Sequence, residues 1–216
     1  MKMQSNNIWF TSDTHYGHKN ICRGVSRWGD YDEDGIFHVD VKSTRDFPDV
    51  ESMNDLMVDN INKNVDANDT LIHDGDWSFG GIDNITEFRE RINCKNVILI
   101  LGNHDHHIQR DEKLRRLFNH VSHYEELKVT KKHDSHKFIL CHYPIISWNG
   151  QREGSYMIHG HQHLKGDKRF GLINHGNSFE NQKRMDIGLC GSPEFRPYHI
   201  DELVDTINIV NKRLIL

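Results

Sequence analysis

Four short apolar runs, each cut off by polar or glycine-rich sequence, constrain the fold of this chain most strongly. They are NIWFTS (7–12), TLIHD (70–74), NVILIL (96–101) and KFILCH (137–142). Each run is too short for a typical helix and is rich in β-branched or aromatic residues, so each predicts a buried strand. A helical apolar pattern fills residues 49–65, with Asp49 as a possible cap. This alternation is typical of an α/β fold with parallel strands.

The remaining sequence adds helices and, in its second half, further strands. One helix is predicted to begin at Asn84, which stands three residues before Glu87 as in a capping box. Further helices are expected at 111–118 and 200–212, and further strands at 123–130, 156–160 and 184–189. The sequence shows no repeat or linker, and 216 residues lie within the range of one domain, so we expect a single domain over residues 1–216.

Residues 29–48, GDYDEDGIFHVDVKSTRDFP, follow neither periodicity. The segment is too acidic and broken to predict a core element, and it is long for a structureless loop in a compact domain. We therefore expect a loop excursion here, either beside the functional site or as a surface flap.

Charge and composition exclude several classes of protein. The chain has 27 Lys and Arg against 32 Asp and Glu, a formal charge of −5, without a basic run. An extended nucleic-acid surface and a membrane-binding surface are therefore not expected. No apolar run is long enough to span a bilayer and MKMQSNNIWF lacks the apolar core of a signal peptide, so a soluble cytoplasmic protein is expected. The four cysteines are dispersed without a CxxC pair, and we interpret them as buried small hydrophobes. The oligomeric state stays open.

Polar residues that could bind a metal follow the ends of the predicted strands. Asp13 and His15 stand two apart after the first strand, a spacing that places both side chains on one side of an extended chain. Ligands of open α/β sheets bind outside the carboxyl ends of the strands, so residues at later strand ends are expected beside them. These residues are Asp76, Asn103, His104, Asp105, His142, His161 and His163.

The donor atoms of this set indicate the kind of metal. Apart from His104 and Asp105, the set contains two Asp, one Asn and four His, which offer oxygen and nitrogen without thiolate and suit Mn²⁺, Fe, Ni²⁺, Zn²⁺ or Co²⁺ more than a soft metal. Seven side chains are too many for one tetrahedral ion. Two ions about 3.5–4 Å apart that share a carboxylate would use them all, and such pairs support in-line phosphoryl displacement by a bridging water that becomes hydroxide near neutral pH.

The blocks DTH, GD, GNHD, the His of CHYP, and GHQH, in this order over residues 10–163, resemble the calcineurin-like metallophosphoesterase superfamily. The flanking stretches GDWSFGG and HYPIISW look most like its small, capless bacterial and phage members. The resemblance implies an α/β fold, specifically a four-layer αββα sandwich with two facing mixed β-sheets.

The resemblance also implies a role for each residue of the blocks. It places Asp13, His15, Asp76 and His163 around one ion, and Asp76, Asn103, His142 and His161 around the other. His104 would contact the substrate phosphate and serve as general acid, and Asp105 would orient it. The expected cofactors are two divalent transition-metal ions, Mn²⁺ foremost, with Fe, Ni, Zn and Co as alternatives. The expected function is hydrolysis of a small, nucleotide-like phosphodiester or phosphomonoester by a metal-bridging hydroxide.

Two alternative functions stay open. One is a nuclease or a protein phosphatase of the same superfamily, and the other is a non-catalytic metal-binding scaffold. Arg23 and Arg27 could hold a substrate phosphate, since guanidinium forks match phosphate oxygens, or could simply lie on the surface. We interpret His18 as a neighbour of the site or a surface residue, and Trp148 as a core aromatic rather than a stacking platform.

Overall fold

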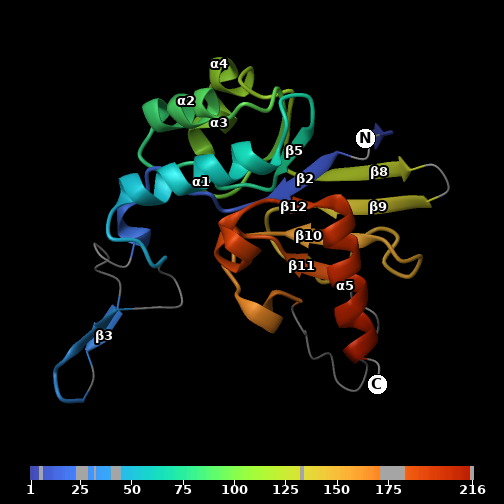
Figure 1. Cartoon of the computed structure of the whole chain (residues 1–216). Helices are drawn as coiled ribbons and strands as arrows, with labels where there is room; N and C mark the ends of the chain where they lie inside the picture. The colour runs from blue at the N-terminus through green and yellow to red at the C-terminus, as the bar shows by residue number, and fades with distance from the viewer. Residues whose placement is uncertain are drawn as a thin grey trace.

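The computed structural model describes residues 1–4, 7–22, 29–31, 33–39, 45–131, 134–170 and 183–214. The fold is mixed α/β, with two five-stranded sheets that each combine parallel and antiparallel pairs (Figure 1). The first sheet has the order β12 (Tyr198–His199), β2 (Ile8–Thr11), β5 (Thr70–His73), β6 (Asn96–Ile100), β7 (His120–Ser122). The second has the order β1 (Lys2–Met3), β8 (Glu125–Lys131), β9 (Asp134–Leu140), β10 (Tyr156–His159), β11 (Arg184–Asp186). All of the predicted strands are confirmed.

The helices are α1 (Val50–Asn64), α2 (Ile82–Arg91), α3 (His106–Arg110), α4 (Glu112–Arg115) and α5 (Ile200–Leu214). Short 3₁₀ turns occupy η1 (Lys19–Ile21), η2 (Gly166–Phe170), η3 (Leu189–Gly191) and η4 (Pro193–Phe195). None of the described helices combines the length and apolar character that a bilayer crossing needs.

The apolar residues sort onto the two faces of the first sheet because strand side chains alternate. Phe10 lies on the inner face and meets Phe138 of the second sheet, with ring centroids 5.3 Å apart. Leu71 lies on the outer face and packs with Met57 of α1 and Phe88 of α2. Figure 1 accordingly shows α1 and α2 over the first sheet, with α5 beside β10 and β11. The two sheets therefore share one core.

Helix starts follow local hydrogen bonding. The side chain of Asp49 accepts a hydrogen bond from the Ser52 amide at 2.7 Å, so this predicted cap of α1 is confirmed. The predicted start of α2 at Asn84 is wrong, because the helix begins two residues earlier, after Gly81 with φ 104°. The Asn84 amide group donates to the Phe79 carbonyl at 2.6 Å instead of capping. Glycine permits the turn to form earlier than the capping pattern suggests.

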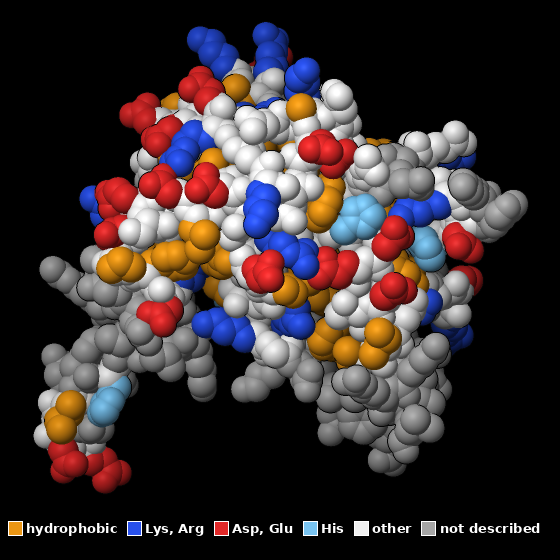
Figure 2. Space-filling model, in the orientation of Figure 1, with side chains coloured by type: hydrophobic (Ala, Val, Ile, Leu, Met, Phe, Trp, Pro, Cys, Tyr) orange, Lys and Arg blue, Asp and Glu red, His pale blue; other side chains and the backbone are white. Residues whose placement is uncertain are grey.

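The segment 29–48 holds a short hairpin and a buried arginine. Strands β3 (Gly29–Tyr31) and β4 (Phe37–Val39) pair antiparallel, and Figure 2 shows this hairpin standing clear of the body. Arg45 is only 3% exposed and donates to the backbone carbonyls of Thr14 and Asp13, after β2. The segment therefore contains a projecting hairpin and, after it, a buried arginine that contacts the backbone after β2.

Candidate metal centre

The structure brings the predicted ligands together at the carboxyl ends of strands from both sheets. In three groups, one ligand atom from each residue lies within 4.8 Å of the others: Asp13, His15 and His163; His15, Asp76 and His104; Asp13, Asp76 and His142. The groups share members, so they form one continuous cluster. These buried Asp and His side chains could hold metal ions.

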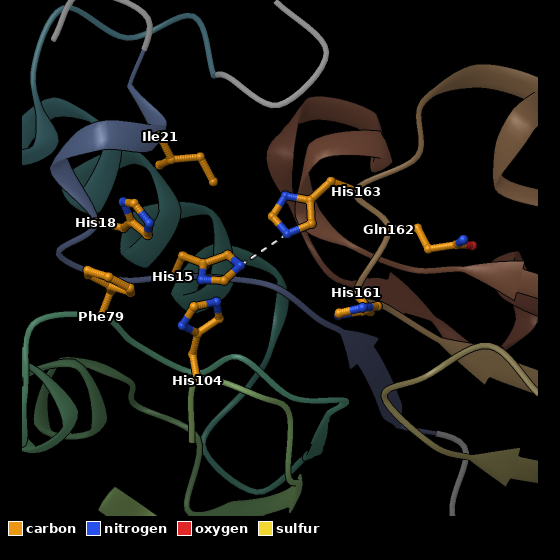
Figure 3. A pocket seen from close by; sticks show the side chains of 8 residues that line it. All are labelled: His15, His18, Ile21, Phe79, His104, His161, Gln162 and His163. Atoms are coloured by element: carbon orange, nitrogen blue, oxygen red, sulfur yellow. Dashed lines mark hydrogen bonds between the residues drawn. The ribbon is translucent and has the colours of Figure 1, made fainter. Parts of the chain in front are cut away.

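Two of the three distances in the first group match the spacing of ligand atoms around one ion, and the third, from Oδ1 of Asp13 to Nε2 of His15, is 3.8 Å. Nε2 of His15 lies 3.1 Å from Nε2 of His163, as Figure 3 shows, and the latter lies 3.3 Å from Oδ1 of Asp13. Ions bound at about 2.0–2.2 Å place neighbouring ligand atoms about 3.0–3.5 Å apart. The donor set and its spacing therefore fit a divalent metal.

Asp76 connects this group to a second set of donors. Its Oδ2 lies 3.5 Å from Nε2 of His15 and 3.5 Å from Nε2 of His142. On the far side, Oδ1 of Asn103 lies 3.2 Å from Nε2 of His142 and 2.9 Å from Nδ1 of His161. Asp76 thus occupies the position between the two donor sets.

The backbone of the cluster is unusual. Five candidate ligands have positive φ: Asp13 (53°), His15 (48°), Asp76 (57°), His161 (71°) and His163 (51°). Among the other described non-glycine residues, only Glu194 and Phe195 share this conformation. It costs on the order of 1–3 kcal/mol per residue and persists where the surroundings enforce it, most often at functional sites. The enforced conformation is an independent sign of a functional site.

Glycines give the carboxylates their space. A Cβ on Gly102 would lie 2.3 Å from Oδ1 of Asp76, and a Cβ on Gly160 would lie 2.2 Å from Oδ2 of Asp13. Both distances are far shorter than a non-bonded carbon–oxygen contact, so these turns require glycine. The glycines of the GNHD and GHQH blocks are therefore part of the site.

Charges in the cluster are strongly coupled. Burial opposes ionisation of Asp13, but its hydrogen bond to His163 and the neighbouring rings hold its pKa well below the usual range. Burial also opposes protonation of His163 and His142, yet their carboxylate partners, Asp13 and Asp76, raise these pKa values to about 10 and about 9. Burial lowers the pKa of His15 well below its ordinary value. In the absence of metal the cluster therefore holds protons that a bound cation would displace.

Asp105 braces the turns that carry these ligands. It is 2% exposed, and its carboxylate accepts hydrogen bonds from the amides of Gly102 (2.8 Å), Asp76 (2.8 Å) and Trp77 (3.0 Å). Burial raises its pKa to about 6. The resemblance implies that Asp105 orients His104. In the structure its carboxylate instead accepts hydrogen bonds from backbone amides, through which it positions Asp76.

Arg45 and Cys190, which the sequence analysis did not select as site residues, contact the residues of the cluster. The Arg45 guanidinium donates to the carbonyl of Thr14 at 2.7 Å, to the carbonyl of Asp13, and to Sγ of Cys190 at 3.3 Å. This sulfur lies 3.6 Å from Nδ1 of His163, on the opposite side of the ring from Nε2. Burial opposes ionisation of Cys190, but Arg45 and His163 lower its pKa to about 6. Cys190 is therefore a polar partner of a candidate ligand rather than an inert apolar residue.

A cavity of about 370 Å³ opens beside the cluster. Figure 3 shows its lining: His15, His18, Ile21, Phe79, His104, His161, Gln162 and His163. The His104 ring faces this cavity.

Two other predictions concern Trp148 and the arginines Arg23 and Arg27. Trp148 is 7% exposed and packs with Ile139 and Met157, which confirms the prediction that it is a core aromatic. Arg23 and Arg27 lie outside the described residues.

The sequence analysis identified only part of the cavity lining. Phe79 stands in the GDWSFGG flank, but no pattern marked it or Ile21 as part of a binding surface. His18 stood close to the first block, and its burial at 5% exposure corrects the surface alternative.

Comparison with known proteins gives relatives without an assigned activity. No family model matches the chain. An uncharacterized protein of Methanocaldococcus jannaschii is 27% identical over 95% of this chain and 93% of its own length. The gene 66 protein of Mycobacterium phage D29 is 27% identical over 96% of this chain and 99% of its own length. A protein of unknown function from Aquifex aeolicus has a crystal structure similar to this one, with a TM-score of 0.57 and 19% identity over 92% of this chain and 98% of that chain. At this identity the likeness concerns the fold alone.

Proposed function

We propose that this protein is a metal-dependent phosphoesterase of the calcineurin-like type that hydrolyses a small, nucleotide-like phosphodiester or phosphomonoester. The observation that carries the proposal is the position of Asp76, whose Oδ2 lies 3.5 Å from the Nε2 atoms of both His15 and His142. A carboxylate shared between two donor sets is what a two-metal site for phosphoryl displacement requires. The proposed cofactors are two divalent ions, Mn²⁺ foremost.

The chain's own residues have distinct tasks in this proposal. When bound, the ions would polarise the phosphoryl oxygens and supply the nucleophile. One ring nitrogen of His104 lies within 4.8 Å of ligand atoms of His15 and Asp76, and the ring faces the cavity. It can therefore donate a hydrogen bond to a phosphoryl oxygen or a proton to the leaving oxygen. Its backbone N–H donates to Oδ1 of Asp76 at 2.9 Å, which couples its position to the shared carboxylate.

The four-layer αββα sandwich belongs to the same proposal. The two mixed sheets pack through one core, and α1 with α2 covers the outer face of the first sheet, which is consistent with three of those layers. The segment after β9, including Trp148, covers part of the outer face of the second sheet.

The proposal is tested by removing metal with a chelator, adding back Mn²⁺, and measuring hydrolysis of bis(p-nitrophenyl) phosphate and p-nitrophenyl phosphate. We expect Mn²⁺-dependent turnover that Asp76→Asn lowers at least 100-fold. The exposed Asp83 of α2 provides a matched control, since Asp83→Asn removes the same charge from a residue outside the cluster. Metal binding without turnover of either ester would favour the scaffold alternative, and turnover confined to DNA or phosphoprotein would favour the nuclease or protein phosphatase.

A further inference from the structure

The cavity beside the cluster has two chemically different sides. Four imidazole rings from the cluster and its neighbourhood form one side: His15, His104, His161 and His163. His18, Ile21 and Phe79 form the other side, which we call the aromatic wall. Figure 3 shows the wall facing the same space as the His104 ring. A ligand held by the cluster would therefore extend along an apolar surface.

The wall presents two flat rings in contact, tilted relative to each other. The ring centroids of His18 and Phe79 lie 3.9 Å apart with their planes 31° from parallel, and Ile21 is 1% exposed behind them. Phe79 is 38% exposed, although exposing a phenyl ring to water is unfavourable in free energy. Its centroid lies 5.4 Å from that of His104, so a group bound on Phe79 would lie next to the proposed site of phosphoryl transfer. An exposed aromatic face at a cavity is a platform for another flat ring.

The wall offers little to a charged or strongly polar group. Among the described residues that line the cavity none is Lys or Arg, and Gln162 is the neutral polar member. These described residues would therefore give a second phosphate or a bare sugar few hydrogen bonds in exchange for its hydration shell, at a cost in free energy. The volume of about 370 Å³ is at the lower end of ordinary ligand pockets, so it suits one ring system with its phosphate.

We propose that the aromatic wall binds a flat aromatic ring of the substrate, so that the protein acts on phosphate esters carrying a nucleobase or an aryl group in preference to alkyl and simple sugar phosphates. This inference rests on the proposed function, because it places the phosphoryl group at the metal cluster. Phe79 is the specificity-determining residue, with His18 packed against it.

The test compares ligands that differ only by the ring, using phosphonates because their C–P bonds are not hydrolysed. Calorimetric titration of the Mn²⁺-loaded protein would compare phenylphosphonate with methylphosphonate. A second arm would compare the methylenephosphonate analogues of adenosine 5′-phosphate and ribose 5-phosphate. We expect the ring to tighten binding about 5–150-fold in at least one arm, the range of a single stacking contact. The arm that responds identifies the ring as a nucleobase or a simple aryl group.

Variants assign this gain to the wall. Phe79→Ala should remove most of it and Phe79→Trp should keep it. Tyr143 is a matched control, because it is 46% exposed and its ring centroid lies 4.9 Å from that of His161, yet it does not line the cavity. Tyr143→Ala should therefore leave the gain unchanged.

The outcomes separate this inference from the proposed function. Equal affinity with and without the ring in both arms would overturn the inference, and it would leave the proposed function standing if the nitrophenyl esters are still hydrolysed. A gain that Phe79→Ala does not reduce would also overturn it. A Phe79-dependent gain in a protein that hydrolyses no ester would support the binding surface and reject the proposed function.

Discussion

Replacing Arg45 by Met should destabilise the fold, because a buried guanidinium holds the loop that carries the first ligands. The substitution keeps an unbranched, though shorter, side chain but removes the donors to the carbonyls of Thr14 and Asp13. A buried acceptor left without a partner costs about 1–3 kcal/mol. Two of them cost about 2–6 kcal/mol, and part is offset because the variant no longer buries a charge. We expect a net loss of about 2–4 kcal/mol in the free energy of unfolding.

Equilibrium unfolding in urea, followed by tryptophan fluorescence with metal removed by chelation, would measure this loss. The matched control is Arg116→Met, since Arg116 is exposed and pairs with Glu112 one helical turn away. Surface pairs of this kind contribute about 0–1 kcal/mol. Repeating both titrations with Mn²⁺ should show a smaller metal-induced stabilisation in the Arg45 variant, because its ligand loop is less ordered. Indistinguishable unfolding midpoints and slopes for the two variants would refute the assignment of Arg45 as the anchor of the site.

Three further predictions concern the cluster. Asp76→Asn should lower the occupancy of both ions and His163→Ala chiefly that of one, as measured by metal analysis after dialysis; full two-metal occupancy in the Asp76 variant would contradict its shared position. If His104 is a general acid, His104→Ala should slow hydrolysis of an alkyl diester on the order of 10²–10⁴-fold and a nitrophenyl diester much less, and parallel losses in kcat/KM would indicate an electrostatic role instead. Metal affinity should rise with pH through neutrality, because the raised pKa values of His142 (about 9) and His163 (about 10) mean that protons must leave as metal binds. Calorimetry in buffers of different ionisation enthalpy should detect that release, and a buffer-independent enthalpy would rule it out.

The parts of the fold that the sequence predicted are those set by local patterns. The strands β2, β5 and β6 are short, apolar and sharply bounded, so their period and length were sufficient. The cluster was predictable for the same reason, because its ligands follow strand ends and parallel strands deliver them to one edge.

The parts that the sequence did not predict depend on tertiary contacts. Arg45 comes from a segment without periodicity, and its role exists only because that segment folds back under the loop after β2. Cys190 is a single cysteine that no sequence motif marks, and its contacts with Arg45 and His163 arise from the fold. Phe79 follows a candidate metal-binding block, yet only its exposed position beside His18 makes it a candidate for substrate recognition. No spacing rule reports contacts of this kind.

The positive φ angles of the candidate ligands have a consequence for how such a sequence can change over evolutionary time. At each of these positions glycine would adopt the same backbone without strain, so the residue that best suits the backbone conformation differs from the one that can bind a cation. Selection for the site must continually oppose this preference. A descendant freed from that selection would be expected to accumulate glycine or asparagine at positions such as His161 and His163 before its core residues changed. Glycine at these turns, on an otherwise intact pair of sheets, would be the signature of a lineage that had lost the chemistry while keeping the fold.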